Sequence, residues 1–205
     1  MEWMIRDWVN WCWLSGDHIV EQHIRNLDAI NWFLGSHPVK AVGFGSRQRR
    51  VTGDQYDNFS IDYEFADGRH LHSMCRQIDG CANYIGEIFV GTKGWLESSN
   101  RFPNTIYRKD GKIAWRWEDE ENPPQDQEHV TLVNAIRTGE PVNYAVETAL
   151  STLNAIQGRE AAYSGKEIVF DELMDSDAVL GPPKDSRGRI RALARIPVPG
   201  TEGRG

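Results

Sequence analysis

The sequence lacks several features that would assign it to a class of protein. Its 205 residues contain no apolar run long enough to span a membrane and no CxxC pair among three cysteines, Cys12, Cys75 and Cys81. Positive charge is also scarce, since the formal net charge is −7. These absences argue against a membrane protein, a disulfide framework and a broad nucleic-acid surface. Cys75 and Cys81 are close enough to join, but the odd count favours free thiols and a cytoplasmic location.

The N-terminus has neither a basic region nor an apolar core typical of a signal peptide. It holds four of the eight tryptophans instead, Trp3, Trp8, Trp11 and Trp13. Three interpretations stay open: the rings fold back onto the domain, they contact another piece of protein, or they stack on a sugar. In the third, Trp13 is a candidate substrate-binding residue.

Periodicity predicts an α+β fold, in which a predominantly antiparallel open sheet is covered on one face by helices. Asp67-Gly68 and Asp110-Gly111 are expected to be hairpin turns. The expected strands are 38–48, 56–68 and 69–78, two within 84–98, two within 105–118, and a short one near 166–170. The expected helices are 15–35, 126–141 and 144–165, with a short one near 171.

The domain is expected to cover residues 1–180. A Pro/Arg-rich tail follows over 181–205, poorly ordered or draped on the surface. Its arginines are more typical of a solvated tail than of an anion site. They are Arg187, Arg189, Arg191 and Arg195.

The helix expected over 15–35 carries its polar residues in one line when drawn at 100° per residue. The members of this stripe are Asp17, His18, Glu21, Arg25, Asp28 and Trp32. Apolar residues cover most of the remaining circumference, which predicts a largely buried helix. A buried charged stripe needs either internal partners, such as Glu21–Arg25 and Arg25–Asp28, or a cleft that holds a ligand. The spacing leaves both explanations open.

A metal site is not expected. His18 and His23 are five residues apart and point to different sides of a helix, unlike the i, i+4 pair of a zinc helix. His23 faces the apolar side and is expected to be a hydrogen-bonded core histidine. His70 and His72 share a strand face that is better explained as a solvated hairpin surface.

A dinucleotide loop is not expected either. The segment "GFGSRQ" has Gly43 and Gly45 but lacks the third glycine of GxGxxG, and no helix follows it.

Several longer motifs resemble one family. "SGDHIVEQHIRNLDAINW" (15–32), "HPVKAVGFGSRQ" (37–48), "SMCRQIDGC" (73–81) and "AIRTGEPVN" (135–143), with "VGTKG" and "STLNAIQGREAAYSGKEIVF", are similar to a branch of the Gfo/Idh/MocA oxidoreductases. That is the glucose–fructose oxidoreductase and inositol dehydrogenase superfamily. The resemblance runs from about residue 2 to residue 170, within the C-terminal domain.

The resemblance implies a substrate-binding α+β domain whose sheet mediates homo-oligomerisation, beside a Rossmann domain that binds NAD or NADP. The family's helix pattern, D-x-G-x-H-x-x-D, places Glu21, His23, Arg25 and Asp28 at its four fixed positions. Arg25 stands where a proton-transferring histidine is expected, and an arginine stays protonated near neutral pH. His18 and Glu21 remain as candidates for proton transfer, and Arg76 is a candidate substrate contact.

The Rossmann domain is missing from this sequence, so we expect the chain alone to hold no nicotinamide cofactor and to be catalytically inert. With that domain, the implied reaction is hydride transfer at a sugar or cyclitol hydroxyl carbon. The alternative is a non-enzymatic carbohydrate-binding or assembly module on the same fold. A metal hydrolase is a weaker third possibility. No nucleic-acid or membrane partner is expected.

Overall fold

The computed structural model describes residues 6–118, 123–181 and 195–201 in two compact units. One unit combines residues 1–81 with 147–205, and the other comprises residues 82–146. None of the helices in the described ranges combines the length and apolar character that crossing a membrane requires. Trp3, Arg187, Arg189 and Arg191 lie outside the described residues, so the expectations about them stay predictions.

The first unit contains a four-stranded antiparallel sheet in the order β3-β2-β1-β8. Its strands are β1 (Pro38–Ser46), β2 (Asn58–Phe65), β3 (His70–Arg76) and β8 (Ile168–Val169). The central strand β2 pairs with both neighbours, Tyr63 lying opposite Ala41 and Leu71. The two strands farthest apart in sequence, β1 and β8, pair side by side.

The predicted alternation in β2 is confirmed. Phe59, Ile61, Tyr63 and Phe65 are at most 3% exposed, while Ser60, Asp62 and Glu64 are only half-buried. A strand places successive side chains on opposite faces, so this pattern gives the sheet an inner and an outer face. The turn at Asp67-Gly68 also forms as expected, with Gly68 at φ 81°.

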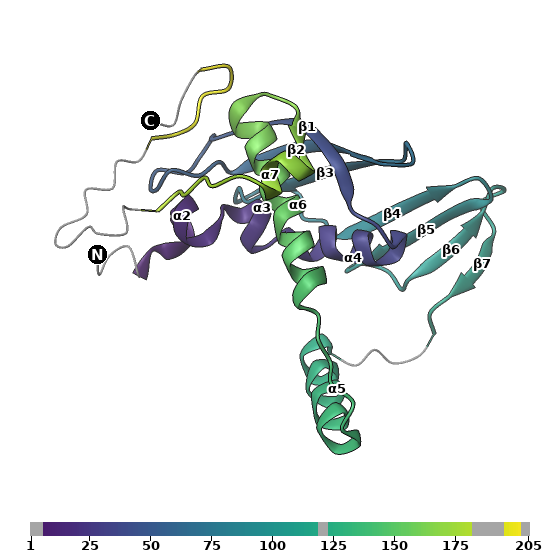
Figure 1. Cartoon of the computed structure of the whole chain (residues 1–205). Helices are drawn as coiled ribbons and strands as arrows, with labels where there is room; N and C mark the ends of the chain where they lie inside the picture. Colours follow the sequence, from purple (N-terminus) through teal and green to yellow (C-terminus); the bar gives the residue numbers. More distant parts are fainter. Residues whose placement is uncertain (1–5, 119–122, 182–194, 202–205) are drawn as a thin grey trace. The chain divides into compact units, whose positions relative to one another are not determined.

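Helix α6 (Ala145–Ser164) is the long helix seen beside the β1–β3 sheet in Figure 1. The Tyr63 hydroxyl on the inner face of β2 donates to the main-chain oxygen of Asn154 at 3.2 Å. A Cβ on Gly158 would lie 2.0 Å from the Tyr63 hydroxyl oxygen, so only glycine permits this approach. The core of the unit therefore lies between the inner face of the sheet and its helices.

The prediction of a single helix over 15–35 is wrong. The structure divides it into α2 (Cys12–Ser15), α3 (His18–Glu21) and α4 (Ile24–Leu34), preceded by the 3-10 turn η1 (Trp8–Asn10). Gly16 and Asp17 separate α2 from α3 with positive φ angles, and Gln22 and His23 separate α3 from α4. The short helix α7 (Phe170–Met174) follows β8.

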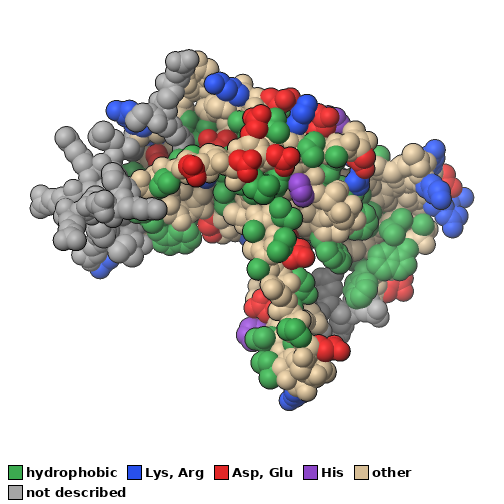
Figure 2. Space-filling model, viewed as in Figure 1, with side chains coloured by type: hydrophobic (Ala, Val, Ile, Leu, Met, Phe, Trp, Pro, Cys, Tyr) green, Lys and Arg blue, Asp and Glu red, His purple; other side chains and the backbone are tan. Residues whose placement is uncertain are grey.

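The second unit contains another antiparallel sheet, in the order β4-β5-β6-β7. Its strands are β4 (Gly86–Gly91), β5 (Gly94–Ser99), β6 (Thr105–Arg108) and β7 (Ile113–Arg116), followed by helix α5 (Pro124–Thr138). The two hairpins match the prediction. Many of their side chains are exposed, and Figure 2 shows hydrophobic groups at this surface with Lys and Arg gathered at one end of the sheet.

The α+β fold class is confirmed, but the described strands form two sheets where one was expected. All three cysteines are free. Of the N-terminal tryptophans, Trp11 is buried, Trp13 is half-buried and Trp8 is 44% exposed. The described part of the tail, 195–201, lies against the first unit, where Pro197 accepts a hydrogen bond from Tyr56. The single-domain boundary at residue 180 stays a prediction.

Candidate functional site

The polar stripe begins with Asp17, which is fully buried. Its backbone adopts φ 76° and ψ 162°, a region that is occupied almost only by glycine. Among the described residues that are not glycine, Asp17 is the one with a positive φ. Such a conformation costs about 1–3 kcal/mol and persists only where the surroundings enforce it. The enforcing contacts are hydrogen bonds to the Asp17 carboxylate.

Four donors meet that carboxylate. Oδ1 accepts from the main-chain N of His18 at 2.5 Å and lies 3.0 Å from His18 Nδ1. Oδ2 accepts from the main-chain N of Tyr56 at 3.0 Å and from the Tyr163 hydroxyl. Burial and the neighbouring Asp17 raise the pKa of Tyr163 well above its usual value, so its hydroxyl remains a donor. Asp17 therefore joins α3 to the loop before β2 and to α6.

His18 is oriented by this carboxylate. A proton on Nδ1 is shared with the Asp17 carboxylate, so in the tautomer that this contact favours Nε2 carries the lone pair. Nε2 is buried and has no hydrogen-bond partner within the described part of the chain. The ring lies 5.1 Å from that of Phe59 and is only 3% exposed. His18 has the tautomer of a general base, but a substrate cannot reach it without local opening.

His23 occupies the break between α3 and α4. Its Nε2 lies 2.7 Å from the Ser73 hydroxyl on the inner face of β3. Burial, and secondarily the nearby His18, lower the pKa of His23 from 6.5 to about 4. The expected hydrogen bond of His23 is confirmed, although its side chain is half-buried and lies outside the buried core, and His23 is neutral at pH 7.

Glu21 and Arg25 do not form the direct pair that their spacing allows. Gln22 bridges them: its amide nitrogen donates to Glu21 Oε1, and its amide oxygen accepts from Arg25 Nη2. Arg25 Nε also donates to the main-chain oxygen of Gln22 at 3.3 Å. Glu21 is half-buried and Arg25 is exposed, which leaves both side chains within reach of a ligand.

Asp28 is exposed on α4 and is held from α6. The Ser151 hydroxyl donates to Asp28 Oδ1 at 2.6 Å, and Asn31 Nδ2 donates to the Ser151 Oγ at 3.2 Å. Because Ser151 Oγ accepts from Asn31, its own proton points to Asp28. The same Asn31 amide donates to Asn154 Oδ1 at 2.8 Å. The Arg25–Asp28 pair expected from i, i+3 spacing is therefore replaced by a tertiary contact.

The predicted site residues fall into four places. His18 is buried beside Asp17, whereas Glu21, Arg25 and Asp28 follow one another along the accessible side of α3 and α4, with Trp32 83% exposed beyond them. Arg76 lies on the outer face of β3, since Ser73 and Cys75 occupy the inner face. Trp13 on α2 lies near Gly181. The structure thus groups Glu21, Arg25 and Asp28, and places Arg76 on the other side of the sheet.

Sequence reasoning missed the residues that organise this stripe. Tyr56, Tyr163, Ser73 and Ser151 contact it from 39 or more residues away, and no local pattern marks them. Asp17 gave one signal: it follows a glycine directly and precedes a helix, which is typical of an N-cap.

Neither a metal nor a dinucleotide has a suitable site in the described segments. They contain no group of three or more His, Cys, Asp or Glu side chains arranged to hold an ion. Gly43 and Gly45 lie within β1, where a Cβ would meet the main-chain oxygens of Ser60 and Asn58. These glycines serve close strand pairing, so the residues present do not fit a dinucleotide cradle.

No protein-family model and no curated protein matches the sequence. Solved structures do match the fold. An oxidoreductase from Thermotoga maritima superimposes with a TM-score of 0.65 at 13% identity, over 84% of this chain and 50% of that one. UDP-N-acetylglucosamine 3-dehydrogenase from Acidithiobacillus ferrooxidans has a TM-score of 0.62 at 18% identity, and the match covers 74% of this chain and 49% of that one. Myo-inositol 2-dehydrogenase from Lactobacillus plantarum has a TM-score of 0.57 at 19% identity, and the match covers 76% of this chain and 49% of that one.

These likenesses, at 13–19% identity, show that the chain shares its fold with part of each of these oxidoreductases. The chain spans about half the length of each of the solved structures that it matches.

Proposed function

We propose that this chain is the substrate-binding and oligomerisation domain of an NAD(P)-dependent oxidoreductase that acts on a sugar or cyclitol hydroxyl. The observation that carries the proposal is the accessible row of Glu21, Arg25 and Asp28, on a fold shared with dehydrogenases whose names specify an amino-sugar nucleotide and a cyclitol. Carboxylates and a guanidinium at this spacing are suited to a polyhydroxylated ligand.

Each side chain has a distinct proposed role. The Asp28 carboxylate, oriented by Ser151 through Oδ1, accepts from one substrate hydroxyl. Arg25 donates to a substrate oxygen and cannot be the base. Between the two candidates for proton transfer, burial favours Glu21: it is half-buried, whereas His18 is enclosed and bound to Asp17. We therefore assign proton acceptance to Glu21 and orientation of the α3 turn to His18.

The cofactor is assigned elsewhere. Because Gly43 and Gly45 form strand pairs, we propose that NAD or NADP is bound mainly by a Rossmann domain outside these 205 residues. The chain alone is then expected to be inert. The three free cysteines support the reducing cytoplasm as its location.

The outer face of the first sheet is the proposed oligomer surface. Phe44 is 72% exposed there, Met74 70% and Val42 43%. Phe44 and Met74 lie on either side of Ser60 in the strand register, so the three side chains form one row across this face. Self-association that buries this row lowers its exposed apolar area. Phe44→Glu is expected to shift the sedimentation of the chain toward monomer.

The substrate role can be tested on the chain itself by NMR titration of ¹⁵N-labelled protein with two neutral probes, myo-inositol and N-acetylglucosamine. Saturable shifts of amides in 21–32 and of the Trp32 indole are expected with at least one probe. Asp28→Asn is expected to weaken that binding about tenfold, because the carboxylate acceptor is lost.

Asp171→Asn, an exposed acid on α7, is the matched control and is expected to leave the affinity unchanged. If neither probe moves residues 21–32, the substrate role is refuted. NADH added to the chain separately tests the cofactor assignment: energy transfer from tryptophan to bound NADH would contradict it.

A further inference from the structure

A depression that is largely open to solvent, with a volume of about 430 Å³, lies in the first unit between the end of β1, the loop that follows it and the segment 196–199; it is called the cavity below. Its wall contains Arg47, Arg50 and Tyr56 on one side and the segment 196–199 on the other. That segment is held in place by the Tyr56 hydroxyl, which donates to the Pro197 main-chain oxygen at 2.9 Å. The main-chain N of Gly200 donates to the Ser164 oxygen at 3.0 Å. Ligand pockets commonly have volumes in this range.

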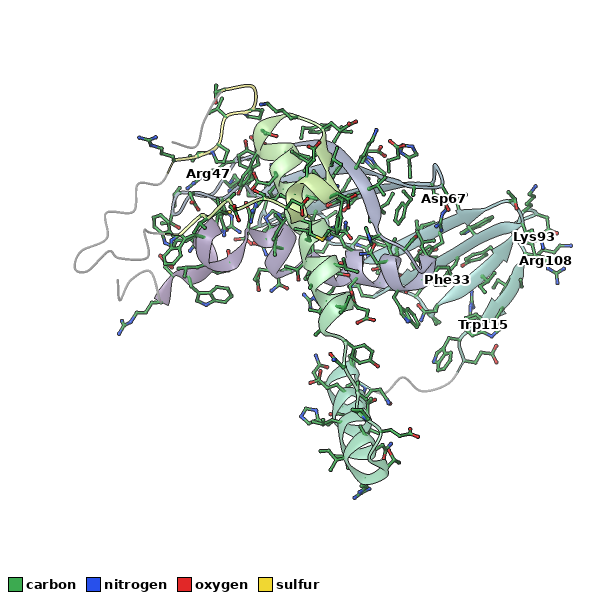
Figure 3. The ribbon with its side chains drawn as sticks, viewed as in Figure 1. Phe33, Arg47, Asp67, Lys93, Arg108 and Trp115 are labelled. Atoms are coloured by element: carbon green, nitrogen blue, oxygen red, sulfur yellow. The ribbon has the colours of Figure 1, made fainter. Side chains whose placement is uncertain are left out.

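Arg47 braces the loop beside the cavity. Its guanidinium donates to three main-chain oxygens, those of Arg50 at 2.7 Å, Thr52 at 3.0 Å and Gly53 at 2.6 Å. Figure 3 labels Arg47, whose loop follows β1. The contacts fix the guanidinium in position, and every acceptor is electrically neutral.

Arg50 also contacts only neutral acceptors. Nη1 donates to Asn10 Oδ1 at 2.9 Å and Nη2 donates to Gln77 Oε1. Its Nε is buried and has no hydrogen-bond partner in residues 6–118, 123–181 and 195–201. Each Nη nitrogen carries a second N–H that these two hydrogen bonds do not use.

Two carboxylates lie close by in sequence: Asp54 accepts from the main-chain N of Cys12 at 2.8 Å, and Asp57 also has its own partners. It accepts from the main-chain N of Gln48, Arg49 and Arg50 at 2.7–3.1 Å and from Asn58 Nδ2 at 3.0 Å. Burial favours its neutral form, but these amides outweigh burial and lower the pKa of Asp57. Neither Arg47 nor Arg50 forms an ion pair with a carboxylate of the described chain. The cavity wall therefore holds two positioned guanidinium groups whose described hydrogen-bond acceptors are all neutral.

We propose that this cavity binds a small-molecule oxyanion, a phosphate or carboxylate carried on an apolar body. Arg47 and Arg50 face the anionic group, and planar guanidinium groups suit both oxyanions. Tyr56 and the apolar segment 196–199 contact the body of the ligand. The site uses none of the residues assigned to the sugar hydroxyls, so it stands independently of the proposed function.

The test is an NMR titration of the full ¹⁵N-labelled chain at low salt, following the arginine Nε–H signals. The probes are phenyl phosphate, benzoate and inorganic phosphate, with benzyl alcohol as the neutral control. Phenyl phosphate or benzoate is expected to shift the Arg50 Nε–H signal saturably, and the one that binds more tightly identifies the anionic group. Because of its apolar ring, phenyl phosphate is expected to bind roughly tenfold more tightly than inorganic phosphate.

Two variants connect binding to the cavity. Arg50→Gln is expected to abolish saturable binding, while Arg69→Gln, an exposed arginine paired with Asp67, serves as its control. Val198→Asp places a carboxylate on the wall at a residue that is 60% exposed, so the fold should persist while binding weakens at least tenfold. Val179→Asp, exposed and outside the cavity wall, is the matched control.

The proposal is overturned if neither phenyl phosphate nor benzoate gives a saturable shift. It is also overturned if Val198→Asp binds them as tightly as the wild type, or if benzyl alcohol reproduces the shift.

Discussion

The two four-stranded sheets differ in how far the chain itself covers them. In the first unit, β2 has four side chains that are at most 3% exposed, packed against helices. In the second, Thr105 is the one strand residue among the described positions that is buried. The cross-strand row Phe89–Leu96–Ile106–Trp115 lies on one face, and Val90, Trp95 and Tyr107 lie on the other. Val90 is 84% exposed and Trp115 45%.

The difference shows that equal strand patterns do not produce equal cores. The first sheet gains stability from α6 and from buried polar contacts that specify one arrangement. The second relies on hairpin pairing and on stacking such as Trp95 against Tyr107, whose ring centroids are 4.9 Å apart. Substitutions of buried polar groups in the first unit should therefore lower the free energy of unfolding much more than substitutions of exposed groups in the second.

The largest effect is expected from Asp17→Ala. It leaves the Tyr163 hydroxyl and the main-chain N of Tyr56 and His18 without their acceptor, at a cost of about 3–5 kcal/mol in the free energy of unfolding. Urea unfolding monitored by tryptophan fluorescence measures it. The control in the second unit is Glu128→Ala, an exposed acid 3.7 Å from His129, which should change stability negligibly. Equal effects of the two substitutions would contradict the comparison.

A smaller effect depends on pH. The folded chain keeps His23 neutral down to about pH 4, whereas the unfolded chain binds a proton at this residue below pH 6.5. Because the unfolded state binds more protons in this window, stability falls as the pH drops from 6.5 to 4, by at most about 1.4 kcal/mol per pH unit. Chemical unfolding across this range measures the slope. His23→Gln should flatten the slope, and an identical slope in the variant would refute this assignment.

The smallest effect is expected from Gly158→Ala. The new Cβ would lie 2.0 Å from the Tyr63 hydroxyl oxygen, so α6 or the tyrosine must move, at about 1–3 kcal/mol. Thermal unfolding measures the loss, and Tyr63→Phe in the same chain should recover part of it. The matched control is Gly91→Ala in the second sheet, where the added Cβ would meet one atom at 3.6 Å. A loss at Gly91 as large as that at Gly158 would count against the distinction between the sheets.

The strands could be predicted because their signals are local. The alternation from Phe59 to Phe65 and the Asp-Gly turns depend on neighbours within a few residues. The placement of Arg25, Asp28 and Trp32 along one line followed from helical spacing in the same way, since α4 is regular over Ile24–Leu34.

The break at Gln22 and His23 could not be predicted, because neither residue disrupts a helix by itself. It accompanies tertiary contacts: Asp17 is held by Tyr56 and Tyr163, 39 and 146 residues away, and His23 by Ser73. A helix drawn as continuous therefore placed Asp17 and His18 on an accessible line, whereas the structure buries both. The cavity beside Arg47 was hidden for the same reason, since the segment 196–199 forms one of its walls.

Tyr56 connects the two ends of the chain, because its main-chain N contacts Asp17 and its hydroxyl contacts Pro197. This has a consequence for synthesis on the ribosome. The first unit cannot assemble its core until α6 and β8 have been translated, although its first three strands emerge early. The hairpins of residues 82–146 can form before α6 and β8 of the first unit have been translated. We therefore expect the apolar inner face of β2 to lack its α6 contacts until residue 164 has been translated, and an apolar face without its cover favours aggregation.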